Sequence, residues 1–122
     1  MSRELYDRAV AISERAYAPY SNYDVGAAVL TRDGRVFEGV NVENAAYPLG
    51  VCAEKTALAK AVSEGYKPGD IEAIGITASP CGGCRQWLYE FRIDEVTFLN
   101  SAGELATYSA AELLPDTWDL PA

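Results

Sequence analysis

The stretch from residue 71 to residue 100, IEAIGITASPCGGCRQWLYEFRIDEVTFLN, constrains the fold of this chain more than any other. It opens with an apolar run over residues 71–78, which predicts a strand buried on both faces. A helix is predicted over residues 81–91, and residues 95–100 predict a second strand. Strands that alternate with helices along a chain are typical of the α/β class.

Two further helices are predicted from the spacing of apolar residues. Residues 3–17 carry apolar side chains at helical intervals, and Pro19 follows just beyond their end. Residues 52–64 show the same spacing, and Gly65 is suited to the left-handed conformation that closes many helices. Both helices have an apolar side that can cover the predicted strands.

The remaining strands form a hairpin in the first third of the chain. Residues 26–31 and 35–41 have β-type sequences, and the Asp33-Gly34 pair between them favours a tight turn. Ser109-Ala110-Ala111-Glu112 is a capping box that predicts a short final helix, with room for one more strand before it. We therefore expect a single domain over residues 1–122. The expected fold is a three-layer α/β/α sandwich with a mixed sheet of about five strands and helices on both faces.

The composition argues against several classes of protein. The chain has 122 residues, is 49% hydrophobic and carries a formal net charge of −8, which indicates an acidic globular protein. Binding to nucleic-acid polymers depends on neutralising phosphates, and no basic stripe is visible, so we expect no such partner. No apolar run reaches the roughly 20 residues that a membrane helix needs. Residues 1–4 lack the apolar core of a signal peptide, so we expect a cytoplasmic protein that does not associate with membranes.

Cysteine placement points to a metal site. Cys52, Cys81 and Cys84 are the only cysteines of the chain, and it has no histidine. In a reducing compartment, such cysteines favour a metal or catalytic role over disulfides. Cys81 and Cys84 lie three residues apart at the predicted start of a helix, so both sulfurs can face one point. Because helix N-termini stabilise anions, we predict that two helix N-termini converge on one metal ion held by three thiolates.

Glu54, two residues after Cys52, is the candidate acid–base group. Residues i and i+2 of a helix point in different directions, so Glu54 can share the site only if Cys52 caps the helix. Three thiolates leave one zinc coordination position for water, from which Glu54 can take a proton. On these residues alone, a structural or subunit-bridging zinc, a redox pair and ordinary buried cysteines remain alternatives.

Several short stretches, in order over nearly the whole chain, form a specific set. The Cys-x-Glu and Pro-Cys-x-x-Cys runs match the signature of zinc deaminases. The full set is Pro19-Tyr20-Ser21, Val25-Gly26-Ala27-Ala28, Gly39-Val40-Asn41-Val42-Glu43-Asn44-Ala45, Cys52-Ala53-Glu54, Ser79-Pro80-Cys81-Gly82, Cys84-Arg85-Gln86 and Glu112-Leu113-Leu114-Pro115. Together these stretches resemble the small cytidine deaminases of the homotetrameric type.

The resemblance implies an enzyme of pyrimidine salvage that hydrolyses cytidine and 2′-deoxycytidine to uridine and 2′-deoxyuridine. It implies one zinc ion per subunit on Cys52, Cys81 and Cys84, with zinc hydroxide attacking C4 of the ring and Glu54 as the proton shuttle. It also implies a homotetramer and a small-molecule nucleoside as the substrate. The alternatives are a deaminase of another cytosine nucleoside, such as a modified cytidine or a blasticidin-type antibiotic, and a non-catalytic, zinc-stabilised interaction domain.

The resemblance also assigns substrate contacts. Asn41 and Glu43 become the ribose-binding pair, a role that suits an amide and a carboxylate, because together they can donate to and accept from a hydroxyl. Tyr23 is expected near the base, and Ala53 is expected to contact the substrate.

The chain departs from the family pattern at three places. Lys55 stands where the family usually has an arginine that contacts the ligand sulfurs, so Lys55 and Arg85 are expected just behind the zinc ligands, where both can offset thiolate charge. The loop before Pro80 is expected to be short. Trp118 is the nearest large aromatic residue after the Leu-Leu-Pro run, either reaching a neighbouring subunit or packing at a surface.

Overall fold

A five-stranded sheet forms the centre of the computed structural model, which describes residues 2–120. Its strand order is β2-β1-β3-β4-β5. β3 and β4 run parallel, whereas the other neighbouring pairs run antiparallel, so the sheet is mixed as predicted. The strands are β1 (Gly26–Thr31), β2 (Val36–Val40), β3 (Ile71–Ile76), β4 (Glu95–Leu99) and β5 (Leu105–Tyr108).

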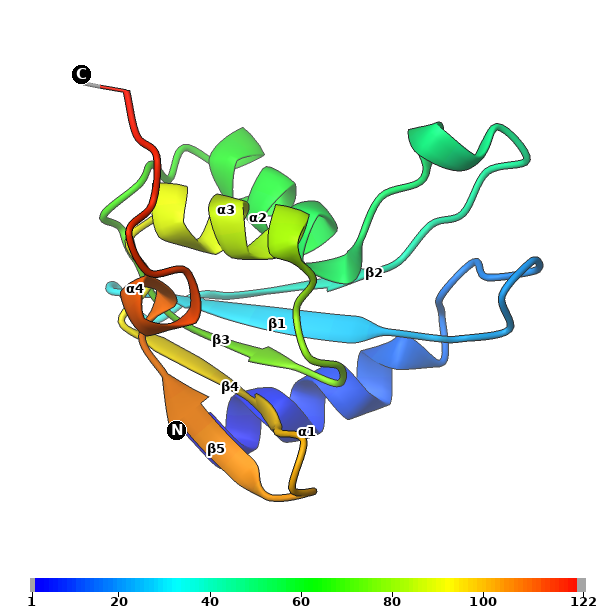
Figure 1. Cartoon of the computed structure of the whole chain (residues 1–122), viewed down its shortest axis with the longest axis horizontal. Helices are drawn as coiled ribbons and strands as arrows, with labels where there is room; N and C mark the ends of the chain where they lie inside the picture. Colours follow the sequence, from blue (N-terminus) through cyan, green and yellow to red (C-terminus); the bar gives the residue numbers. More distant parts are fainter. Residues whose placement is uncertain (1, 121–122) are drawn as a thin grey trace.

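Helices cover both faces of the sheet, which confirms the predicted three-layer arrangement (Figure 1). α1 (Ser2–Ser13) packs on one face, against β1 and β3. α2 (Ala53–Ser63) and α3 (Gly82–Glu90) lie on the other face. The short helix α4 (Ala110–Leu113) follows β5 and contacts α3, and a 3₁₀ turn, η1 (Tyr47–Leu49), lies in the long loop between β2 and α2.

The two central strands are the most deeply buried part of the sheet. Every residue of β1 is buried, and β3 is buried except at Glu72, as expected for strands covered on both faces. The larger apolar core lies between the sheet and the α2/α3 layer, and a smaller one lies under α1. Burial of this apolar surface is the main force that holds the three layers together.

Three glycines let helices approach the sheet closely. The first is Gly26 of β1, where a Cβ atom would clash with the backbone carbonyl of Ala9 in α1. A Cβ atom on Gly39 of β2 would lie only 2.4 Å from the backbone nitrogen of Ala57 in α2. A Cβ atom on Gly75 of β3 would lie 2.5 Å from the backbone nitrogen of Tyr6 in α1. Gly39 thus sets how closely α2, the helix that carries Cys52 and Glu54 at its start, packs on the sheet.

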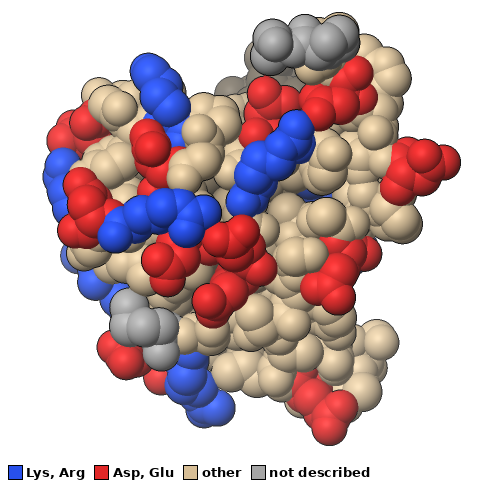
Figure 2. Space-filling view, turned by 90° about the vertical axis from the view of Figure 1, so that its left-hand side faces the viewer, with Lys and Arg blue, Asp and Glu red and all other residues tan. Residues whose placement is uncertain are grey.

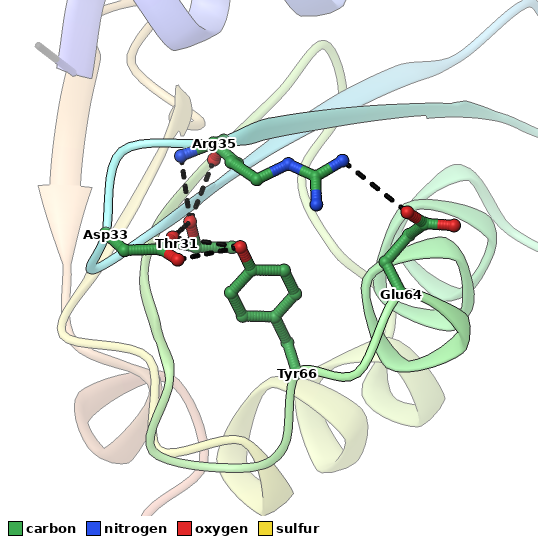
Figure 3. Close-up of polar contacts among 5 residues, drawn as sticks. All are labelled: Thr31, Asp33, Arg35, Glu64 and Tyr66. Carbon is green, nitrogen blue, oxygen red and sulfur yellow. Dashed lines mark hydrogen bonds and ion pairs between the residues drawn. The ribbon is translucent and has the colours of Figure 1, made fainter.

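A polar cluster ties the end of α2 to the β1–β2 hairpin (Figure 3). The Tyr66 hydroxyl donates a 2.8 Å hydrogen bond to Asp33, and the Thr31 hydroxyl donates to the same carboxylate. Arg35 lies over the ring of Tyr66 and pairs with Glu64 at 3.5 Å. The hydrogen bonds from Thr31 and Tyr66 hold the pKa of Asp33 below its usual value.

The observed elements follow the predicted order, and most ends differ by one or two residues. The main difference is α1, which ends at Ser13 although the pattern predicts helix to residue 17. Tyr17 instead forms a β-bridge with Val42, with a 3.1 Å hydrogen bond from the Tyr17 nitrogen to the Asn41 carbonyl. Pro19 disfavours helix only at Ala18, so the earlier end of α1 follows from the bridge, which draws Tyr17 away from the helix.

Candidate active site

Three cysteine side chains meet where α2 and α3 begin. Cys52 is the N-cap of α2, Cys81 is the N-cap of α3, and Cys84 lies in the first turn of α3. Their Sγ atoms lie within 4.8 Å of one another, and all three are free thiols. The predicted convergence of two helix N-termini on one point is therefore confirmed.

The donor set suits a zinc ion. Tetrahedral zinc with Zn–S bonds of about 2.3 Å places its sulfur ligands roughly 3.8 Å apart, so the observed cluster needs only a small contraction. Three sulfurs leave one coordination position open, as in catalytic sites, whereas structural sites close with four protein ligands. The two helix N-termini offset part of the negative charge that three thiolates would bring.

A hydrogen bond between Cys52 and Cys84 shifts the pKa values of the two thiols in opposite directions. The Cys84 thiol donates to Cys52 and lowers the pKa of Cys52 to about 6. The same hydrogen bond, together with burial, raises the pKa of Cys84. Because metals bind the thiolate, a metal ion that binds all three sulfurs displaces the proton of Cys84.

Glu54 is the second residue of α2, and only 4% of its surface is exposed. Burial raises the pKa of its carboxyl group, and a hydrogen bond with Cys84 opposes this shift in part. With Cys52 in the capping position, the helix start brings Glu54 to the same site as the sulfurs, as the spacing argument predicted. A buried carboxyl group of this kind is suited to taking up and releasing protons.

A cavity of about 760 Å³ opens onto this cluster. Cavities of this size hold small molecules. The structure brings together at its wall the four residues predicted to bind substrate and three of the four predicted for metal binding and catalysis. These are Tyr23, Asn41, Glu43 and Ala53, with Cys52, Glu54 and Cys81; the fourth, Cys84, is buried behind the wall.

Glu43 holds the loop between α1 and β1 against the cavity. Its Oε1 accepts hydrogen bonds from the backbone nitrogens of Tyr20 (3.0 Å) and Ser21 (3.1 Å). The Ser21 hydroxyl donates to its Oε2. These hydrogen bonds, with Ser21 the strongest contributor, lower the pKa of Glu43. Ser21 is not among the site residues predicted from the sequence, although it lies in one of the quoted stretches.

Asn41 holds the same loop by its backbone at Tyr23 and Val25, nearer to β1 than the part that Glu43 holds. Its Oδ1 accepts a 2.8 Å hydrogen bond from the backbone nitrogen of Val25. Its Nδ2 donates a 2.9 Å hydrogen bond to the Tyr23 carbonyl. Asn41 and Glu43 therefore shape one wall of the cavity as well as facing it.

Lys55, Arg85 and Trp118 do not line this cavity. Lys55 lies at the start of α2, and its ammonium is 5.8 Å from the centre of the Trp87 ring. Arg85 donates its side-chain hydrogen bonds to oxygen atoms, the nearest being the Pro80 carbonyl at 2.8 Å. Trp118 is 71% exposed, next to Asp119, which pairs with Arg92 at 2.6 Å.

The charged surface is mixed. On the face shown in Figure 2, Lys and Arg side chains lie among Asp and Glu side chains. The ion pairs Arg8–Glu38 and Arg32–Asp94, both 2.9 Å long, reflect this mixing. It differs from the basic stripe that proteins use to bind nucleic acid. Within residues 2–120, none of the helices has the length and apolar character needed to cross a bilayer.

Comparison with known proteins agrees with the geometry. A sequence model of the cytidine and deoxycytidylate deaminase zinc-binding region matches residues 1–100. A cytidine deaminase of Halalkalibacterium halodurans is 44% identical over 119 residues, covering 91% of this chain and 89% of that protein. A probable cytidine deaminase of Dictyostelium discoideum is also 44% identical, covering 89% and 78%. The crystal structure of a cytidine deaminase from Burkholderia pseudomallei matches with a TM-score of 0.89 and 46% identity, covering 97% and 99%. The chain belongs to the cytidine deaminase family.

Proposed function

We propose that this protein is a zinc-dependent hydrolase that deaminates cytidine and 2′-deoxycytidine to uridine and 2′-deoxyuridine. The observation that carries the proposal is the meeting of three cysteine sulfurs and the buried Glu54 at one cavity large enough for a nucleoside. Membership of the cytidine deaminase family supports the same reaction. The reaction consumes one water molecule and releases the exocyclic amino group as ammonia.

Cys52, Cys81 and Cys84 would hold the zinc ion, which when bound lowers the pKa of a water molecule so that it can attack at neutral pH. Glu54 takes a proton from this water on a carboxylate oxygen. Its buried position raises its pKa, which favours holding that proton. Glu54 passes this proton to N3 of the ring, and then moves the second proton of the former water from the C4 hydroxyl to the amino group, which leaves as ammonia while the C4 carbonyl forms.

Asn41 and Glu43 would bind the sugar with the hydrogen-bonding capacity that the loop leaves free. Glu43 Oε1 already accepts two hydrogen bonds, whereas Oε2 accepts one from Ser21. Asn41 Nδ2 uses one of its two hydrogens on Tyr23. One acceptor position on Glu43 Oε2 and one donor on Asn41 Nδ2 remain, and together they match a single sugar hydroxyl. This supports a nucleoside, rather than a free base, as substrate, with Tyr23 and Ala53 beside the base.

Lys55 would supply positive charge behind the thiolates. Its ammonium group contributes to the low pKa of Cys52, after the hydrogen bond from Cys84. Its distance to the Trp87 ring, 5.8 Å, lies within the range of cation–π contacts. Trp87 would thus hold Lys55 near the sulfurs without the planar fork of an arginine.

A panel of nucleosides tests the proposal against its alternatives. Zinc-loaded protein is mixed with cytidine, 2′-deoxycytidine, a base-modified cytidine and a blasticidin-type antibiotic, and the deaminated product and ammonia are measured. We expect turnover of cytidine and 2′-deoxycytidine. Turnover confined to the modified cytidine or the antibiotic would favour the second substrate class. No turnover, with zinc bound and no thermal stabilisation by a cytidine analogue, would favour a non-catalytic domain.

We also propose a homotetramer that works in pyrimidine salvage in the cytoplasm. Exposed apolar residues support assembly: Tyr47 is 90% exposed and Leu49 is 70% exposed in the loop before α2. An apolar groove of about 570 Å³, with Val51 and Trp87 in its wall, lies on the outer side of α2 and α3. Apolar surface of this kind marks protein interfaces, and free thiols suit a reducing compartment. Light scattering should give the mass of four chains, and a monomer mass would contradict the proposal.

A further inference from the structure

The three cysteines differ in how the fold holds them. Cys52 directly follows a β-bridge in which Val42 and Val51 exchange two backbone hydrogen bonds of 3.0 and 2.9 Å. Cys84 is fully buried inside α3. Cys81 lacks both supports, because it is exposed and no β-bridge precedes it. Its side chain makes no capping hydrogen bond, and its carbonyl, which accepts from the Arg85 nitrogen at 2.9 Å, ties it only to α3.

The chain around Cys81 has little intrinsic stiffness on its helical side. Gly82 and Gly83 follow it, and a Cβ atom on Gly82 would meet nothing within 4 Å. Glycine costs more conformational entropy to order than any other residue. A ligand at this place therefore needs a contact from elsewhere in the fold to keep its sulfur near the other two.

Arg85 supplies that contact. Its Nε donates a 2.8 Å hydrogen bond to the carbonyl of Pro80, the residue directly before Cys81. Its Nη2 donates to the Ser79 hydroxyl at 3.3 Å. The first bond holds the peptide group that joins Pro80 to Cys81, and the second holds the Ser79 side chain. The planar guanidinium allows both to form at once.

The third hydrogen bond of the guanidinium reaches a different part of the molecule. Arg85 Nη1 donates at 3.1 Å to the carbonyl of Leu113, the last residue of α4. α4 is itself fixed, because Ser109 and Glu112 form a complete capping box and the Ala110 nitrogen donates to the Ile93 carbonyl at 3.1 Å. Arg85 thus braces the Cys81 loop against an element that the rest of the fold holds in place.

We propose that Arg85 is a positioning residue for the metal ligand Cys81 and couples α4 to the metal centre. The inference rests on the zinc site of the proposed function, but not on the identity of the substrate. Arg85 acts through the Pro80 carbonyl and the Leu113 carbonyl rather than through contact with a sulfur or with the nucleoside. Loss of the guanidinium hydrogen bonds should weaken zinc binding roughly 10- to 100-fold, the usual effect of removing a hydrogen-bonding partner behind a metal ligand.

The test measures zinc affinity by competition with a chromophoric chelator, and the thermal midpoint with and without zinc, for Arg85→Gln and Arg85→Lys. Arg92→Gln is the matched control, because the Arg92 guanidinium also links two parts of the chain. It donates a 2.9 Å hydrogen bond to the Tyr89 carbonyl and another to the Asp119 carboxylate in the C-terminal segment. We expect Arg85→Gln to lose zinc affinity, Arg85→Lys to lose part of it, and Arg92→Gln to keep it. Absorption of the Co²⁺-loaded proteins reports the thiolate geometry directly, and it should change in the Arg85 variants only.

A second variant tests the coupling to α4. Ser109→Ala removes the capping box and should weaken zinc binding severalfold in the presence of Arg85, but add little to Arg85→Gln. Unchanged zinc affinity in Arg85→Gln, or an equal loss in Arg92→Gln, would overturn the proposal. If Arg85→Gln does not fold, Arg85→Lys decides, because full zinc affinity there would also overturn it. Tight zinc binding without deamination would refute the proposed function and leave this inference standing.

Discussion

Glu43 illustrates, at the scale of single residues, how one side chain serves both the fold and the site. Its carboxylate closes the loop that carries Tyr20 and Ser21 and keeps one acceptor position free. The local sequence indicates a polar pair at residues 41 and 43, but not this partner. Ser21 lies 22 residues away along the chain, and only the packing of the loop on the strand end brings it to Glu43.

Ser21→Ala should therefore raise the KM for cytidine about tenfold with little change in kcat, because a mispositioned Glu43 binds substrate and transition state equally less well. Ser13→Ala is the matched control, since the Ser13 hydroxyl donates to the Val10 carbonyl at the end of α1. Steady-state kinetics of both variants check the prediction. An unchanged KM in Ser21→Ala would show that Glu43 does not depend on this hydroxyl.

Asp33 gives a prediction about pH. Its pKa is lower in the folded protein than its ordinary value of 3.8, so the ionised carboxylate stabilises the fold above that pH. This contribution is lost as the pH falls through the lowered pKa. Asp33→Asn keeps a turn-forming residue but should lower the thermal midpoint at neutral pH.

The difference between Asp33→Asn and the unaltered chain should shrink below pH 3.8. Tyr66→Phe removes one of the donors to Asp33, so it should reproduce part of the effect. Thermal unfolding across the acid range measures both variants. A difference that stays constant with pH would remove Asp33 from the account of stability.

At the scale of elements, the starts of α2 and α3 are predictable because local chemistry sets them. Cysteine at a cap position, small residues after it and an apolar stripe occur together in the sequence, and the helices begin one residue after Cys52 and Cys81. The end of α1 is not predictable in the same way. It depends on the bridge between Tyr17 and Val42, a tertiary contact that overrides helical spacing.

Two of the close helix approaches, at Gly39 and Gly75, allow the effect on stability to be measured apart from the effect on metal binding. Gly39→Ala and Gly75→Ala should each cost about 1–3 kcal/mol of unfolding free energy, because each forces a helix away from the sheet. Gly39 faces α2, which carries Cys52, whereas Gly75 faces α1 on the opposite side. Only Gly39→Ala should also lower zinc affinity.

Chemical denaturation and chelator competition measure the two effects independently. Equal zinc affinities in Gly39→Ala and the unaltered chain would show that the α2 approach does not set the metal geometry. If Gly75→Ala lost as much zinc affinity as Gly39→Ala, the packing of α1 would affect the metal site as strongly as the packing of α2 does.

At the scale of the whole molecule, the strand order β2-β1-β3-β4-β5 assembles the site. It places the start of α2, the start of α3 and the end of β2 around one cavity. The sequence predicts the three layers and the convergence of helix ends, since both follow from periodicity and capping. It does not predict the contact between Arg85 and Leu113, because these residues lie 28 positions apart and meet only through the packing of α4 on α3.

Glu54 is the residue that moves the proton in the proposed zinc-dependent deamination. The most direct measurement compares the rate of uridine and ammonia formation from cytidine by the unaltered chain and by Glu54→Gln, each shown to hold one zinc ion. We expect steady turnover by the unaltered chain and a rate lower by a factor of about 10²–10⁴ for Glu54→Gln. Equal rates at equal zinc content, or no uridine from the zinc-loaded unaltered chain, would contradict it.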